Sequence, residues 1–177
     1  MKSTVEALQI RHKLLQLFEK AHSIKNELEL QRMMNIVVVG GGPTGVEVSG
    51  ALAEMKKYVL PKDFPELDFS KMNIYLLEGA DKTLAAMSEK SSKQSGKYLK
   101  RLGVTVMTNT LVKDYDGQNI MLQNGDEIPT STVIWAAGIK GNVPAGIDSS
   151  LIGKGNRIKT DRRCLVQGFN NIYAIGD

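Results

Sequence analysis

The spacing of apolar and polar positions changes at residue 35. Before it, residues 4–30 carry apolar side chains at helical spacing with Glu and Lys between them, which predicts one or two amphipathic helices. From Asn35 the run "IVVVG" is β-branched and ends in glycine, as expected for a strand buried on both faces of a parallel sheet. We therefore expect a helical extension at residues 1–34 and a main domain at residues 35–177.

Helices and strands alternate in the next part of the chain. The pattern predicts helices at 44–59 and 87–103, the second capped by Ser88 and closed by Gly103, and strands at 73–78 and 104–109. The segment "KDFPELDFSKM", between the helix at 44–59 and the strand at 73–78, is expected to be a loop. Shorter strands then follow, joined by the turn dipeptides Asp116-Gly117 and Asn124-Gly125, and the last of them contains "TVIWAAG". This order predicts an α/β fold with a doubly wound, Rossmann-like parallel sheet and a three-stranded antiparallel β meander in place of one crossover helix.

A glycine-rich motif lies between the first strand and the following helix. Gly40, Gly42 and Gly45 have the spacing G-x-G-x-x-G. In this context the first glycine permits a tight turn, the second lets a pyrophosphate approach the backbone, and the third allows close packing of helix and strand. A turn without a ligand is the alternative, but glycines at this density destabilise a helix start unless something needs the close approach. The motif predicts a dinucleotide site.

Two acidic residues extend this prediction. Glu78 ends the second strand, where an acid can bind the ribose hydroxyls and favour NAD(H) over NADP(H), although Lys82 could instead hold a phosphate. Glu47 is expected in the first turn of the helix after the glycines. The helix dipole alone accounts for an acid there, and contact with the nicotinamide end of the ligand is the alternative.

Composition removes several classes of function. Cys164 is the only cysteine among the 177 residues, so no internal disulfide and no cysteine-rich metal site are expected. The net charge of +4 comes from scattered pairs of basic residues and aromatic content is only 6%, which argues against nucleic-acid binding. Without a run of about 18 apolar residues or a secretory signal, the sequence predicts a soluble cytoplasmic chain.

Several segments together resemble a known family. The stretches "VVVGGGPTGVEVSGAL", "IYLLEGADKTL", "RLGVTVMTNTLV", "VIWAAGIKGN" and "NNIYAIGD" resemble flavoproteins with two dinucleotide-binding domains, and most of all type II NADH dehydrogenase, the single-chain NADH:quinone oxidoreductase. The resemblance implies a pyrophosphate site at the glycine-rich turn, a ribose site at Glu78, and a nicotinamide side formed by the end of the last parallel strand. It also implies that residues 1–34 belong to the connection to a FAD domain and that residues 35–177 form the NAD(H)-binding domain. The last two residues would contact FAD. The residues concerned are Gly40, Gly41, Gly42, Pro43, Thr44, Gly45, Glu47, Glu78, Ala137 and Gly138 for NADH, and Gly176 and Asp177 for FAD.

The resemblance also implies a function, which is to position NADH for hydride transfer to FAD in a respiratory-chain NADH:quinone oxidoreductase. No glycine-rich FAD loop precedes Gly40, so we expect a domain fragment that is inactive alone. Quinone and the cytoplasmic face of the membrane would be reached through other parts of the full-length protein, and a homodimer is compatible with the family. The alternatives are the NAD(P)H domain of a disulfide, ferredoxin or sulfide:quinone reductase, or a stand-alone NADH-sensing module.

Overall fold

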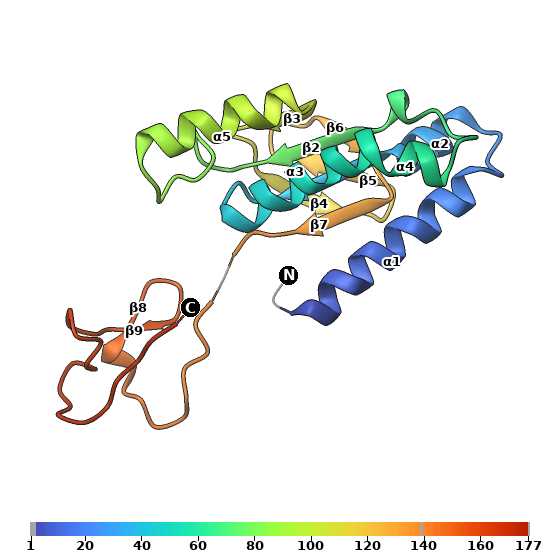
Figure 1. Ribbon diagram of the computed structural model, residues 1–177. Helices are drawn as coiled ribbons and strands as arrows, with labels where there is room; N and C mark the ends of the chain where they lie inside the picture. The colour runs from blue at the N-terminus through green and yellow to red at the C-terminus, as the bar shows by residue number, and fades with distance from the viewer. Residues whose placement is uncertain (1–2, 139, 177) are drawn as a thin grey trace. The chain divides into compact units, whose positions relative to one another are not determined.

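The computed structural model describes residues 3–138 and 140–176, which belong to two compact units, Met1–Ala137 and Gly138–Asp177. Figure 1 shows the elements of both. The helices of the first unit are α1 (Thr4–Ala21), α2 (Glu27–Met34), α3 (Pro43–Tyr58), α4 (Leu60–Asp63), the 3-10 helix η1 (Phe69–Lys71) and α5 (Glu89–Arg101). Its strands are β1 (Asn35–Val39), β2 (Asn73–Leu77), β3 (Val104–Met107), β4 (Val112–Tyr115), β5 (Asn119–Leu122), β6 (Glu127–Pro129) and β7 (Thr132–Trp135).

A parallel sheet forms the centre of the first unit, with the strand order β3-β2-β1-β7. In the middle of this sheet, Val38 of β1 is in register with Leu76 of β2 and Ile134 of β7. All five residues of β1 are buried, as the unbroken β-branched run predicted. Strands β4, β5 and β6 pair antiparallel in a separate meander. The predicted fold class is therefore confirmed.

The two faces of the parallel sheet are covered by different kinds of structure. Because successive side chains of a strand point to opposite faces, Ile36 and Val38 lie in one hydrophobic cluster and Val37 and Val39 in another. The first cluster includes α3 and α5 residues such as Leu52, Ala53 and Leu99. The second is completed by Ile120, Leu122 and Ile128 of the meander. The meander thus buries the face that a crossover helix would otherwise cover.

The segment predicted as a loop before β2 is partly helical, so that prediction was wrong for α4 and η1. Phe69 is buried and packs edge-on against Phe18 of α1 at a centroid distance of 5.3 Å. Phe64 lies 6.0 Å from the same Phe18 ring. Charged residues lie between Phe64 and Phe69 in the sequence, so the apolar pattern did not indicate that both rings contact α1. Their packing holds the segment in a defined shape.

Helices α1 and α2 pack against the parallel sheet of the first unit. Leu14 and Phe18 of α1 are buried in the same cluster as the sheet residues Ile36 and Val38. Ser3 caps α1 and Asn26 caps α2, each by accepting a hydrogen bond from a backbone N–H three residues on. None of the described helices is both long and apolar enough to cross a membrane.

The second unit has little regular structure. It contains a 3-10 helix, η2 (Ser149–Leu151), and a two-stranded antiparallel pair, β8 (Ile152–Gly153) and β9 (Arg157–Ile158). Val166 is its buried apolar residue among those described. The sequence pattern predicted no separate unit at this position.

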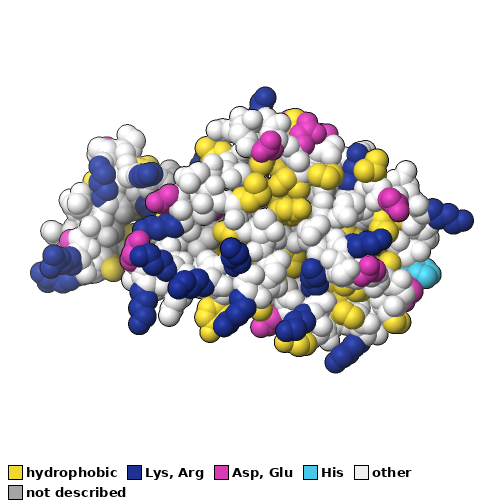
Figure 2. Space-filling view, turned by 90° about the horizontal axis from the view of Figure 1, so that it is seen from above, with side chains coloured by type: hydrophobic (Ala, Val, Ile, Leu, Met, Phe, Trp, Pro, Cys, Tyr) yellow, Lys and Arg dark blue, Asp and Glu magenta, His cyan; other side chains and the backbone are white. Residues whose placement is uncertain are grey.

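Figure 2 shows that lysine and arginine side chains are spread over the visible face of the molecule, with acids between many of them.

Candidate functional site

The glycine-rich turn begins where β1 ends, and Gly40 makes its first bend. The φ of Gly40 is +108°, a region that side-chain-bearing residues rarely adopt, and its N–H donates a 2.7 Å hydrogen bond to the carbonyl oxygen of Leu77. A Cβ atom on Gly40 would come within 2.8 Å of the backbone nitrogen of Ala137. Glycine is therefore required both for the turn and for the close approach of the chain at the end of β7.

Gly45 brings α3 close to β1. A Cβ atom on this residue would overlap the carbonyl oxygen of Gly40, and would also lie 3.4 Å from the Cδ1 atom of Leu76. The carbonyl belongs to the backbone and can move only if the turn itself moves. This arrangement gives Gly45 the packing role that the sequence motif assigns to its third glycine.

Gly42 differs from both because the space in front of it is open. A Cβ atom there would have no described neighbour within 4 Å. Gly42 is the N-cap of α3, no side chain caps this helix, and Pro43 occupies the first helical turn. The first N–H groups of a helix lack intrahelical partners and carry a partial positive charge. The open backbone at Gly42 is therefore suited to receive an anionic group such as a phosphate.

Glu78 lies directly beside the glycine-rich turn. Its Oε2 atom accepts a 2.5 Å hydrogen bond from the N–H of Gly41, and its Oε1 atom accepts a 2.7 Å bond from the N–H of Ala80. A Cβ atom on Gly41 would come 2.9 Å from Oε2, so a side chain there would displace the carboxylate from its present position. Two backbone N–H groups thus fix both oxygens of Glu78 at the carboxyl end of β2.

The segment after Glu78 supports the turn from the other side, and sequence reasoning missed this contribution. Leu84 donates a 2.8 Å hydrogen bond from its N–H to the carbonyl oxygen of Gly41, with a φ of +52° that is rare for leucine. Thr83 is buried, and its hydroxyl lies 2.6 Å from that of Ser95 in α5. Nothing in the residue type of Leu84 signals this conformation. The glycine-rich turn is therefore held by β2, β7 and the residues 80–84.

The other candidate residues belong to α3, to the end of the first unit and to the second unit. Glu47 is exposed, and because α3 begins at Pro43 it falls beyond the first turn, so the prediction of a first-turn acid was wrong. Ala137 ends the first unit beside Gly40, whereas Gly138, with a φ of +74°, starts the second. Gly176 belongs to that second unit and has a φ of +104°. Asp177 lies outside the described residues.

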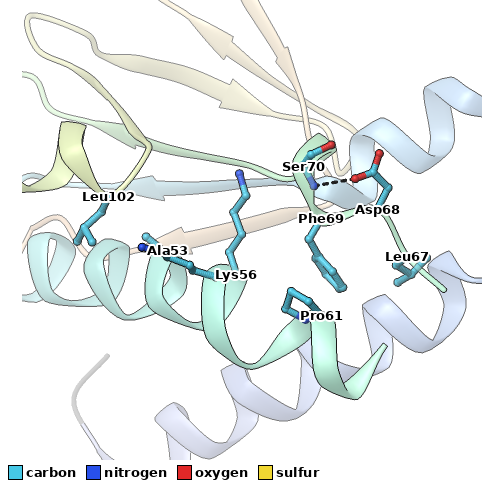
Figure 3. A pocket seen from close by; sticks show the side chains of 9 residues that line it. Ala53, Lys56, Pro61, Leu67, Asp68, Phe69, Ser70 and Leu102 are labelled. Atoms are coloured by element: carbon cyan, nitrogen blue, oxygen red, sulfur yellow. Dashed lines mark hydrogen bonds between the residues drawn. The ribbon is translucent and has the colours of Figure 1, made fainter. Parts of the chain in front are cut away.

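A hollow elsewhere on the first unit is a weaker candidate. It is lined by residues of α3, α4 and η1 that include Ala53, Lys56, Pro61 and Phe69, and Figure 3 shows their side chains. Lys56 donates a 2.7 Å hydrogen bond from Nζ to the carbonyl oxygen of Met72, just before β2. The hollow therefore lies toward the amino end of β2. Ligands of open α/β sheets bind outside the carboxyl ends of the strands, where the glycine-rich turn is.

The fold and the turn define a Rossmann-type dinucleotide-binding protein. The sequence profile described as pyridine nucleotide-disulphide oxidoreductase matches residues 2–177. The chain belongs to this family.

Named relatives agree with the resemblance seen in the sequence. The chain is 30% identical over 189 residues to the type II NADH:quinone oxidoreductase Ndh of Mycobacterium tuberculosis, covering 100% of this chain and 40% of that protein. It is 34% identical over 185 residues to the external alternative NAD(P)H-ubiquinone oxidoreductase B3, mitochondrial, of Arabidopsis thaliana, covering 100% of this chain and 32% of the relative. The chain thus spans less than half the length of these curated relatives.

A solved structure shows a similar fold. The structure of NDH2 from Plasmodium falciparum in complex with NADH matches 80% of this chain and 30% of its own, with a TM-score of 0.74 and 27% sequence identity. The match extends the similarity from sequence to three-dimensional structure. It also shows that a protein with this fold has been solved with NADH.

Proposed function

We propose that this chain is the NADH-binding part of a flavin-dependent NADH:quinone oxidoreductase, in which it positions NADH for hydride transfer to FAD. The observation that carries the proposal is the open backbone at Gly42, at the uncapped start of α3, with the Glu78 carboxylate fixed beside the same turn. The open backbone suits a pyrophosphate, and the carboxylate suits the hydroxyl groups of a ribose. The names of the relatives, among them an NADH:quinone oxidoreductase, favour this function.

The polar groups at the glycine-rich turn support binding of NADH, because open backbone N–H groups and a carboxylate lie at the same turn. The pyrophosphate would lie against Gly41 and Gly42, and the N–H groups that follow Pro43, including those of Thr44 and Gly45, would receive it. The ribose hydroxyls would donate to Glu78, and Ala137 would line the path toward the nicotinamide. Hydride donation is the chemistry that NADH supplies when bound. The chain's own contribution is to bind the nucleotide and orient it.

The remaining contacts belong to the same proposal. Glu47 and Gly138 would lie toward the nicotinamide, and Gly176 with Asp177 would contact FAD. Reduction of quinone, attachment to the cytoplasmic face of a membrane and formation of a homodimer would be properties of the full-length protein. Vesicle co-sedimentation of that protein tests membrane attachment, and size-exclusion chromatography tests formation of the homodimer. A role in a disulfide, ferredoxin or sulfide:quinone reductase, or as an NADH sensor, is less well supported because the relatives described above are named for quinone reduction.

Calorimetric titration of the chain with NADH and NADPH tests the nucleotide site. We expect tighter binding of NADH, because a 2′-phosphate would meet the negative charge of Glu78. The variant Glu78→Gln should bind NADH more weakly and lose most of the preference, since a single amide oxygen cannot replace both carboxylate oxygens. Tighter binding of NADPH by the unmodified chain would contradict the ribose assignment.

A matched substitution controls for the change in net charge. Glu54 is an exposed acid of α3, further along the helix from the glycine-rich turn, so Glu54→Gln should leave both affinities unchanged. A loss of selectivity in this control as large as in Glu78→Gln would show that the preference comes from overall charge. Failure of the unmodified chain to bind either nucleotide would overturn the proposed function.

A further inference from the structure

Lys82 is the only basic residue in the segment 78–88, which follows the expected ribose site. The segment returns to the glycine-rich turn, because Leu84 donates its N–H to the carbonyl oxygen of Gly41. A lysine in this segment is therefore a candidate partner for a 2′-phosphate on a ribose held at Glu78. By its position alone, Lys82 would favour NADPH.

The structure shows Lys82 engaged with a different partner. Its Nζ atom donates a 2.7 Å hydrogen bond to Oε2 of Glu89, and the two side chains are 35% and 64% exposed. Glu89 is the first residue of α5, where Ser88 caps the helix by accepting the N–H of Ser91. The hydrogen bond and the charge of Glu89 raise the pKa of Lys82, and Lys82 lowers the pKa of Glu89 in the same way. Both groups are therefore charged near neutral pH.

On the basis of the proposed function, we infer that Glu89 determines nucleotide specificity by pairing with Lys82 and so withholding its ammonium group from a 2′-phosphate. To bind that phosphate, Lys82 would have to leave Glu89, and an unpaired carboxylate would remain close to the phosphate. Asp81 adds a further negative charge, and its proximity also raises the pKa of Lys82. The region beyond Glu78 is thus kept unfavourable for a dianionic group although it contains a lysine.

Titrations of Glu89→Gln with NADH and NADPH test this inference. Glutamine keeps the size of the side chain and removes its charge, so Lys82 becomes available to the ligand. Because an exposed ion pair contributes little binding free energy, we expect the affinity for NADPH relative to NADH to rise by only about two- to fivefold. The gain should shrink at high salt, because the contact is exposed and screened.

A second variant tests whether the gain in NADPH affinity comes from Lys82 or from another lysine nearby. The charge of Lys93 in α5 also lowers the pKa of Glu89, and Lys93 lines a hollow together with Lys82 and Glu89. If Lys82 causes the gain, the double variant Glu89→Gln with Lys82→Met should return to the selectivity of the unmodified chain. The control Glu54→Gln, which removes an equal charge elsewhere, should show no gain.

The outcomes distinguish this inference from the proposed function. NADH binding with an unchanged NADPH-to-NADH ratio in Glu89→Gln would overturn the role of Glu89 and leave the proposed function intact. A gain that persists in the double variant, or that also appears in Glu54→Gln, would likewise overturn it. Absence of binding of either nucleotide to the unmodified chain would overturn both.

Discussion

Replacement of Gly42 by alanine separates ligand binding from folding at the glycine-rich turn. A Cβ atom at this position would have no described neighbour within 4 Å. The φ of −72° and ψ of −177° at Gly42 are accessible to alanine. The added methyl group would therefore fill only the open space in which a pyrophosphate would lie.

The expected change in stability is small because two effects oppose each other. Alanine is a poorer N-cap than glycine by about 0.5–1 kcal/mol. Loss of the conformational freedom of glycine in the unfolded chain stabilises the folded state by about 0.4–1 kcal/mol. We therefore expect the free energy of unfolding to change by less than about 0.5 kcal/mol.

The expected change in binding is larger. The methyl group would keep a phosphate oxygen away from at least one backbone N–H, and a hydrogen bond to a charged group contributes about 1.5–3 kcal/mol. NADH binding by Gly42→Ala should accordingly be about 10- to 150-fold weaker than that of the unmodified chain.

Tryptophan fluorescence provides the assay, with calorimetry as an independent measurement. Trp135 is the only tryptophan of the chain, is 57% exposed, and lies on β7 two residues before Ala137. NADH absorbs where tryptophan emits, so binding near this strand should quench the signal. Gly50→Ala is the control, because Gly50 lies within α3 with open space around its Cβ position. It should stabilise the chain by about 0.5–1 kcal/mol and leave NADH binding unchanged. Unimpaired NADH binding by a folded Gly42→Ala would refute the placement of the pyrophosphate.

Two further substitutions test the packing around the site. Gly45→Ala should lower the free energy of unfolding by about 1–3 kcal/mol, measured in urea, because the methyl group would overlap the carbonyl oxygen of Gly40; unchanged stability would show that α3 can move away from β1. Phe18→Ala should cost about 3–5 kcal/mol, since this ring is buried against Phe69. In comparison, Val5→Ala on the exposed part of the same helix should change stability by less than about 0.5 kcal/mol. Similar small effects of both would show that α1 does not unfold together with the sheet.

The parallel sheet and the meander could be predicted because their signals are local. The run at β1 is apolar at every position after Asn35, which is typical of a strand covered on both faces. Gly117 and Gly125, in the two predicted turn dipeptides, have φ values of +95° and +93°. These conformations favour glycine, so the residue type itself marked the turns between the meander strands.

Features that depend on distant partners could not be predicted in the same way. Asn35 is buried, and its Oδ1 atom accepts hydrogen bonds from the side chains of Gln31 and Asn73. Its Nδ2 group donates to the carbonyl oxygen of Pro129, 94 residues later in the chain. A polar residue at the start of an apolar strand indicates only a strand end. Its role in joining α2, β2 and the end of β6 appears only when all of these partners are in place.

The candidate site shows the same division between local and distant causes. The motif assigned a turn to Gly40 and close packing to Gly45, and the atoms that a Cβ would meet at each position account for both roles. The bond between Gly41 and Glu78 joins residues 37 positions apart, and no local pattern contains it. The unusual backbone of Leu84 is likewise imposed by its contact with Gly41.

The bonds of Glu78 explain why a carboxylate suits this position better than an amide. An ionised carboxylate has about four acceptor positions and no donor. The N–H groups of Gly41 and Ala80 use one position on each oxygen, so each oxygen keeps a position that a ribose hydroxyl would use under the proposed function. Glutamine would direct its NH₂ group at one of the two N–H donors and lose that bond. The backbone therefore orients the acid before a ligand arrives, and binding of a ribose would not have to order the side chain first.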